Sequence, residues 1–300
     1  MKLIIYPDVD IWEFVLSGLK LRSDVMRFPL NRHSNIIQKV SRKYGSTIPL
    51  PVHFVLSSCL QNTIKGLKSG DAVVIAEYTN PTLLFAISKI LPEGVSRYIW
   101  LWNHKGDNKL FVNNLLAIQK HHFQVITYDE LDAKKFGFRC HAQFFNIRPY
   151  QQVASLEVKA ILYDFFFVGY AKNRVEEIES IRSLLSSYTC KFVTVHSTSE
   201  YIPYTDYMEM ALQSRCLVEI VHSGDSSCTL RPLEAMTIHR KLLTNNPAVR
   251  NYSFFRPQNI FVLGEDDISR LPEFLHSPFE PLPSDVVDSY DVNSWVDIFH

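Results

Sequence analysis

The stretch Cys216–Thr244, CLVEIVHSGDSSCTLRPLEAMTIHRKLLT, places two apolar runs on either side of a segment long enough for a helix. The runs Cys216–Ile220 and Lys241–Thr244 are typical of short buried strands, and Arg231–His239 is the expected helix. A small polar loop, Ser223–Thr229, leads from the first strand into this helix. Strands that alternate with helices predict a mostly parallel sheet covered by helices.

The same alternation extends through the rest of the chain. Further strands are predicted at Leu3–Tyr6, Pro51–Leu56, Ala72–Ala76, Arg97–Leu101, Gln124–Thr127, Tyr163–Val168, Lys191–Val195 and Asn259–Leu263. We therefore predict an α/β protein of two facing Rossmann-like domains with an inter-domain cleft. The polar, aperiodic stretch Asn146–Ser155 is the expected linker, so the domains are residues 1–155 and 156–285. A terminal helix within residues 286–300 is expected to pack back on the first domain.

Composition excludes several classes of protein. The 300 residues contain 31 Lys+Arg and 31 Asp+Glu, so the formal net charge is zero and no broad electrostatic grip on nucleic acid is expected. Five scattered cysteines without a C-x-x-C pair indicate a reducing cytoplasm rather than a disulfide framework or a cysteine zinc site. No apolar run is long enough to span a membrane, which leaves only peripheral contact with the membrane face open.

The loop before the helix at residues 231–239 has the chemistry of an anion site. Free N–H groups at a helix start, together with the helix dipole, bind phosphate. Ser226, Ser227 and Thr229 add hydroxyl donors, and Arg231 lies in the first turn. One turn on, Glu234 can accept two hydrogen bonds from a ribose diol, since an ionised carboxylate has two acceptor oxygens. The alternative is a polar capping loop whose glutamate only favours the helix dipole.

From Thr229 onward the sequence resembles bacterial GT-B-type glycosyltransferases of lipopolysaccharide and capsular polysaccharide biosynthesis. Three blocks occur in that group's order: TLRPLEA at Thr229–Ala235, KLLTNN at Lys241–Asn246 and YSFFRPQNI at Tyr252–Ile260. The stretches YIWLWNHK (Tyr98–Lys105), ITYDELDAKKFGF (Ile126–Phe138) and YDFFFVGYAKNR (Tyr163–Arg174) are similar to the same group.

The resemblance implies a cytoplasmic, metal-independent glycosyltransferase without a cofactor, in which a nucleotide sugar is the donor. The acceptor would be a surface glycan or a lipid-linked glycan, held by the first domain near Asn103. The second domain would bind the donor through Gly169, Lys172, Arg174, Tyr204, Ser226, Ser227, Thr229, Leu230, Arg231 and Glu234.

One departure from the group leaves the donor sugar and the stereochemistry open. Many retaining members carry a second glutamate where this chain has Ser226. If transfer inverts the sugar, one carboxylate or histidine must lie within hydrogen-bond reach of the acceptor hydroxyl. Strand ends in the first domain offer Asp8, Asp10, Glu77, His104 and Asp129 as candidates, although such a residue is more often a cap, a turn residue or a solvated loop end.

One alternative is rejected at this point, and two stay open. Asp8 and Asp10 form a D-x-D pair, which binds a hard cation in the other glycosyltransferase fold, but the two-domain pattern disfavours that fold. A nucleotide-sugar epimerase would use the same architecture without an acceptor. A non-catalytic scaffold subunit of a polysaccharide assembly complex would retain the fold alone.

Overall fold

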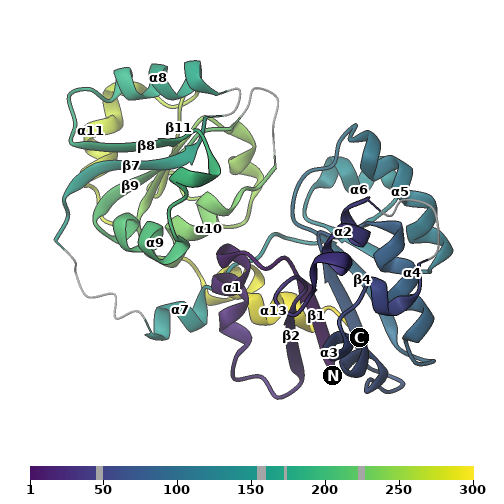
Figure 1. Cartoon of the computed structure of the whole chain (residues 1–300). Helices are drawn as coiled ribbons and strands as arrows, with labels where there is room; N and C mark the ends of the chain where they lie inside the picture. Colours follow the sequence, from purple (N-terminus) through teal and green to yellow (C-terminus); the bar gives the residue numbers. More distant parts are fainter. Residues whose placement is uncertain (45–49, 154–159, 172–173, 222–226) are drawn as a thin grey trace. The chain divides into compact units, whose positions relative to one another are not determined.

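Strand β3 (Ala72–Ala76) has the sequence AVVIA, and each of its residues is buried. A strand that is apolar on both faces belongs inside a sheet that helices cover on both sides. The computed structural model (Figure 1) describes residues 1–44, 50–153, 160–171, 174–221 and 227–300. In it, β3 pairs in parallel with β1 (Lys2–Tyr6) on one side and β4 (Ser96–Leu101) on the other.

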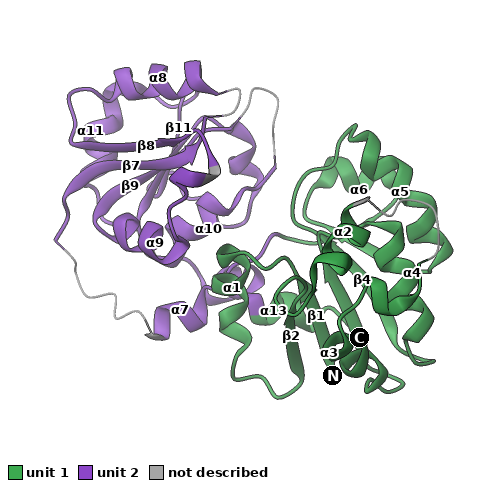
Figure 2. Ribbon diagram, viewed as in Figure 1, with its two compact units in different colours: residues 1–142, 293–300 green, residues 143–292 purple. Residues whose placement is uncertain are grey.

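The chain forms two compact Rossmann-like units, shown in different colours in Figure 2. Unit 1 comprises residues 1–142 and 293–300, and unit 2 comprises residues 143–292. Each unit is built on one sheet, and the strand pairs described in both sheets are parallel. The predicted α/β class with two such folds is therefore confirmed.

The sheet of unit 1 has the strand order β2-β1-β3-β4-β5-β6. The remaining strands are β2 (Val25–Pro29), β5 (Gln124–Thr127) and β6 (Arg139–Cys140). The helices are α1 (Asp10–Leu16), α2 (Ile36–Tyr44), α3 (Ser58–Lys65), α4 (Pro81–Ile90), α5 (Lys109–Lys120), α6 (Glu130–Phe136) and α13 (Val292–Asp297). The strand order reverses between β1 and β3, and ligands of such sheets bind beyond the carboxyl ends of the strands at this point.

The sheet of unit 2 has the strand order β11-β10-β9-β7-β8. Its strands are β7 (Tyr163–Tyr170), β8 (Cys190–Val195), β9 (Ser214–Glu219), β10 (Lys241–Thr244) and β11 (Ile260–Val262). Its helices are α7 (Arg148–Val153), α8 (Val175–Leu184), α9 (Tyr204–Leu212), α10 (Leu230–Thr237), α11 (Leu271–His276) and α12 (Ser284–Ser289). Here the order reverses between β7 and β9, so the loops after these two strands flank the expected binding position.

The C-terminal segment completes the core of unit 1. Trp295 and Phe299 are fully buried, and their rings contact those of Trp100 and Tyr98 at centroid distances of 5.7 and 5.2 Å. The Tyr98 hydroxyl also donates to the carbonyl oxygen of His300 at 2.5 Å. The two aromatic side chains near the C-terminus thus find the apolar surface that they require.

The predicted strand at Pro51–Leu56 is wrong. Val52–Phe54 forms a short 3-10 helix, and the Val55 and Leu56 carbonyls accept hydrogen bonds from side chains of α2 instead of from a strand. A short apolar run does not by itself distinguish a strand from another buried segment. The strand that pairs with β1 on the side away from β3 is β2, whose pattern VMRFP has an arginine at its centre and a terminal proline.

The expected linker is part of unit 2, which begins at Gln143. Phe144, Phe145 and Ile147 are fully buried, and the polar residues that follow form α7. The Gln151 side chain of α7 donates to the carbonyl oxygen of Thr237 at 3.0 Å. Polarity in this stretch therefore marks a short surface helix, which composition alone does not distinguish from a linker. Each helix among the described residues is too short or too polar to span a bilayer.

Candidate functional site

Polar residues gather at the carboxyl edge of the unit 1 sheet. Strands β3, β4 and β5 are parallel neighbours, so the residues that follow them lie next to one another. Glu77 follows β3, the loop Trp102–Gly106 follows β4, and Asp129 and Asp132 follow β5. Asp10, another predicted candidate, begins α1 just beyond β1 on the same edge.

Glu77 organises the loop that follows β4. Its carboxylate accepts the backbone N–H of Trp102 and of Asn103, the latter at 2.7 Å, and pairs with the Lys105 ammonium at 2.6 Å. Its backbone has a φ of +64°, a conformation that costs a non-glycine residue about 1–3 kcal/mol and clusters at functional sites. Glu77 and Asn103, both predicted from the sequence, are thus joined directly.

His104 is held by two buried carboxylates. Its Nδ1 lies 3.2 Å from Asp129 Oδ2 and 3.4 Å from Asp132 Oδ1. The histidine is 46% exposed, whereas the aspartate side chains are only 3% and 1% exposed. A proton on Nδ1 would face these carboxylates, and Nε2 would then be the acceptor nitrogen of the ring. This arrangement is able to remove a proton from a hydroxyl and to stabilise the imidazolium that results.

The two aspartates are themselves fixed by backbone donors. Asp132 accepts the N–H of Lys105 at 2.5 Å and of Gly106 at 2.8 Å, and Asp129 caps α6 by accepting the Asp132 N–H at 2.7 Å. Sequence reasoning included His104 and Asp129 but missed Asp132. Asp132 lies in the first turn of a helix, where an acidic residue is ordinary, so its position along the chain gave no signal of a site.

Gly106 is required for the position of the His104 ring. Its φ is +49°, and a Cβ placed there would lie 2.6 Å from His104 Nε2. We expect Gly106→Ala to displace the ring, because the methyl group and the imidazole cannot occupy the same space. Gly137→Ala is the matched control, since Gly137 has a φ of +70° with nothing within 4 Å of the added Cβ.

Both variants should lose about 1–2 kcal/mol of stability from the left-handed backbone conformation alone. Only Gly106→Ala should in addition impair any reaction that uses His104. Urea denaturation and initial rates, measured on both variants, separate these effects. Equal rates in the two variants would show that the ring position does not matter.

The same cluster also contains side chains of the types that bind cations. Among the described residues, one ligand atom each from His104, Asp129 and Asp132 lie within 4.8 Å of one another. The two carboxylates already accept backbone N–H groups, and the histidine nitrogen nearest them, Nδ1, already faces both carboxylates. The D-x-D acids are not part of this group, and Asp8 pairs with Arg32 at 2.8 Å.

In unit 2, the residues that follow β7 and β9 lie at the point where the strand order reverses. The Arg174 guanidinium donates to the carbonyl oxygens of Tyr170, at 2.9 Å, and of Ile220, and so joins the ends of β7 and β9. A Cβ on Gly169 would lie 2.8 Å from the Phe167 ring and 3.4 Å from Arg174 Nη2, so this position has no room for a side chain. Lys172 lies outside the described residues.

Thr229 caps the start of α10 and is anchored by a buried glutamate. Its hydroxyl accepts the Arg231 N–H at 3.1 Å and donates to Glu219, which is 3% exposed. The second oxygen of Glu219 accepts the Thr244 hydroxyl at 2.5 Å. Sequence reasoning missed Glu219, although an acid inside the apolar run CLVEI is the signal that could have identified it.

Glu234 is enclosed within unit 2. It is 4% exposed, and its carboxylate accepts the hydroxyl groups of Tyr204 and of Tyr207, the latter at 2.5 Å. Arg231 Nη1 lies 3.1 Å from the same carboxylate, and the guanidinium also stacks on the Tyr207 ring at 4.8 Å. A ribose diol would have to displace a tyrosine hydroxyl to reach Glu234.

The other predicted donor residues lie around the start of α10. Leu230 is its first residue, and the buried Ser227 accepts a hydrogen bond at its carbonyl oxygen from Asn246 Nδ2 at 3.1 Å. Arg231 Nη2 donates to the carbonyl oxygen of Val168 in β7 at 2.8 Å. Ser226 lies outside the described residues.

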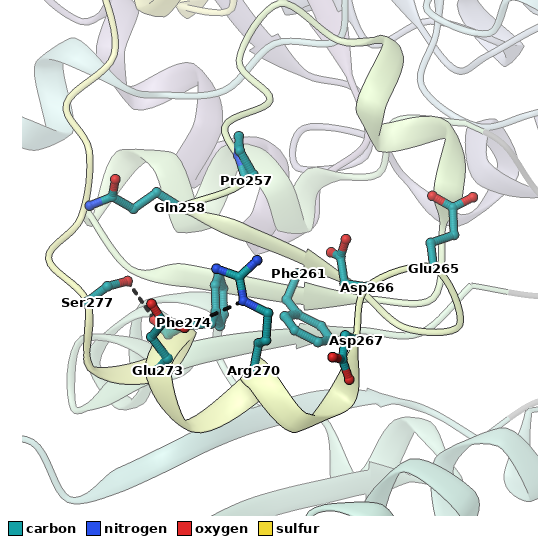
Figure 3. A pocket seen from close by; sticks show the side chains of 10 residues that line it. All are labelled: Pro257, Gln258, Phe261, Glu265, Asp266, Asp267, Arg270, Glu273, Phe274 and Ser277. Carbon is teal, nitrogen blue, oxygen red and sulfur yellow. Dashed lines mark hydrogen bonds and ion pairs between the residues drawn. The ribbon is translucent and has the colours of Figure 1, made fainter.

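A pocket of about 560 Å³ lies along the edge strand β11 and the helix α11 (Figure 3). Its lining residues are Pro257, Gln258, Phe261, Glu265, Asp266, Asp267, Arg270, Glu273, Phe274 and Ser277. The acidic side chains around it outnumber the single arginine, which disfavours a diphosphate by like-charge repulsion. None of the predicted donor residues lines this pocket, so it is not the site described above.

No protein-family model and no curated protein sequence matches this chain. Among solved structures, it is similar to the DNA-modifying enzyme β-glucosyltransferase, which was determined with and without its substrate uridine diphosphoglucose. The identity is 14%, over 92% of this chain and 89% of that chain, with a TM-score of 0.43. A similarity of this size assigns no activity.

Proposed function

We propose that the protein is a metal-independent glycosyltransferase that moves a sugar from a nucleotide-sugar donor to a hydroxyl of a glycan or lipid-linked glycan. The main support is His104, an exposed imidazole whose Nδ1 faces two buried carboxylates at the carboxyl edge of a parallel sheet. The sequence blocks that resemble GT-B glycosyltransferases, from Thr229 to Ile260, support the donor class.

Unit 1 would supply the base. His104 Nε2 takes the proton of the acceptor hydroxyl as its oxygen bonds to the anomeric carbon of the donor sugar. The bond from that carbon to the diphosphate oxygen breaks, and its electron pair leaves with the nucleoside diphosphate. Asp129 and Asp132 stabilise the imidazolium, and the sugar is transferred with inversion.

Unit 2 would bind the nucleotide and stabilise the leaving group. The start of α10 lies beyond the carboxyl end of β9, where free N–H groups and the helix dipole favour a diphosphate. Arg174 joins the ends of β7 and β9 at this position, so its positive charge is held close to the reversal point of the sheet. Charge of this kind would substitute for a metal ion in leaving-group stabilisation.

Thermal unfolding with a panel of UDP, GDP, CMP, ADP and dTDP sugars tests the donor class. A ligand present at about 100 times its Kd should stabilise the protein by about 2.7 kcal/mol, and EDTA should not change this result. We expect Arg174→Ala to weaken the stabilisation. The control Arg182→Ala, on the exposed side of α8 and paired with Glu179, should respond like the wild type.

The outcomes discriminate between the candidate functions. Conversion of the donor alone into an isomer would identify an epimerase. Stabilisation that EDTA abolishes would contradict metal independence, and the absence of a response to every sugar nucleotide would favour the scaffold subunit.

A further inference from the structure

Acidic residues are missing from a long part of unit 1. Residues 25–70 contain no Asp or Glu, in a chain whose acidic and basic residues are otherwise equal in number. The same segment contains Arg27, Arg32, Lys39, Arg42, Lys43, Lys65 and Lys68. One of these cations, Arg32, is neutralised by Asp8 and Glu13 from outside the segment, at 2.8 and 2.6 Å.

Helix α2, in the middle of this segment, buries polar side chains and exposes apolar ones, the reverse of an ordinary surface helix. Its buried side chains are polar: Gln38 and Arg42 are 6% and 8% exposed. Gln38 Nε2 donates to the carbonyl oxygens of His53 and Leu56, both at 3.0 Å, and Arg42 Nη1 donates to that of Val55 at 2.5 Å. The helix is therefore attached to the unit by hydrogen bonds rather than by an apolar face.

The apolar side chains of α2 point outward instead. Ile36, Ile37 and Val40 are 79%, 55% and 50% exposed, and Phe54 of the adjoining 3-10 helix is 40% exposed. A surface helix of a globular protein ordinarily buries such a stripe. Exposed aliphatic side chains that lie together mark an interaction surface.

The charges around these side chains indicate which surface they contact. Lys39 and Lys43 are exposed on the same helix, and the acid-free segment continues through α3. A helix with aliphatic residues on one side and lysines beside them lies in the interface of an anionic bilayer. Protruding isoleucines have no counterpart in a phosphate backbone, which disfavours nucleic acid.

We propose that α2 docks unit 1 on an anionic lipid surface. Ile36, Ile37 and Val40 insert between the headgroups, and Lys39 and Lys43 contact lipid phosphates. Helix α2 follows the carboxyl end of β2, the sheet edge that also carries His104. A lipid-linked acceptor would then be presented to that edge, a consequence that rests on the proposed function, whereas lipid binding by α2 does not.

Co-sedimentation with phospholipid vesicles tests this surface. The full chain should bind phosphatidylglycerol vesicles more tightly than phosphatidylcholine vesicles, and added salt should weaken the binding. Ile36→Asn/Ile37→Asn should reduce binding at least about tenfold, because it removes the inserted apolar groups. Each of Lys39→Gln and Lys43→Gln should reduce it about fivefold. All of these side chains are exposed, so the variants should fold.

Helix α8 offers a matched control. Val175 and Leu184 are both 48% exposed, which is close to the 55% of Ile37 and the 50% of Val40. They lie, however, on a helix rich in glutamate. Val175→Asn/Leu184→Asn should leave vesicle binding unchanged. Equal binding to both lipids, or wild-type binding by the α2 variants, would overturn the proposal. Competition by a DNA duplex would instead assign the surface to nucleic acid. Binding of sugar nucleotides is measured separately, so either proposal can fail alone.

Discussion

Replacement of His104 by alanine is expected to lower the rate of glycosyl transfer by about 10²–10⁴-fold, the contribution of a positioned general base. The loss should come from chemistry rather than from unfolding. The ring is 46% exposed, and the two aspartates behind it keep their backbone N–H donors. Initial rates with the sugar nucleotide that stabilises the protein, together with the melting temperature, measure both effects.

His196→Ala is the control for this experiment. His196 is exposed in unit 2 and belongs to neither part of the candidate site, so its variant should keep wild-type rates. Full transfer by His104→Ala would reject this base and leave Asp8, Asp10, Glu77 and Asp129 as the remaining candidates.

Replacement of Glu234 by alanine is expected to lower the free energy of unfolding of unit 2 by about 3–5 kcal/mol, as when one partner of a buried ion pair is removed. The variant would leave the hydroxyl groups of Tyr204 and Tyr207 and the Arg231 guanidinium without their common carboxylate. These groups join α9 to α10, so both helices should be affected. Urea denaturation followed by far-UV circular dichroism measures the change.

Two features of the chain make this test selective. The four tryptophans, Trp12, Trp100, Trp102 and Trp295, all lie in unit 1, so tryptophan fluorescence monitors the unit that is not altered. Glu179→Ala, which removes an exposed ion pair with Arg182, should cost no more than about 1 kcal/mol. A similarly small loss in Glu234→Ala would show that the buried carboxylate is not structural.

Glu234→Gln separates structure from binding. The amide keeps the shape of the side chain and one acceptor oxygen, so this variant should be closer to wild type in stability. If it folds but is no longer stabilised by any sugar nucleotide, the predicted ribose contact is supported. Unchanged nucleotide binding would assign Glu234 to the α9–α10 contact alone.

Local patterns in the sequence determined most of the segments that become strands and helices, although not Pro51–Leu56 or β2. The fully apolar AVVIA of β3 requires burial on both faces, and Asn80, Asp129 and Thr229 each cap the helix that follows them. These signals work because capping and periodicity depend on residues within one or two turns of each other. The α/β class and the strand-end positions of His104 and Asp129 could therefore be predicted.

Tertiary structure alone decided which side chains meet. The contact of His104 with Asp132 depends on β4 and β5 being neighbours, and the enclosure of Glu234 by Tyr204 and Tyr207 depends on how α9 packs against α10. The inverted polarity of α2 has the same origin, because Gln38 and Arg42 find carbonyl acceptors in a segment that its sequence presents as a strand. Contacts between residues far apart in the chain are set by strand order and packing. The pattern of polar and apolar residues along the sequence indicates which side chains are buried, but not which residues they contact.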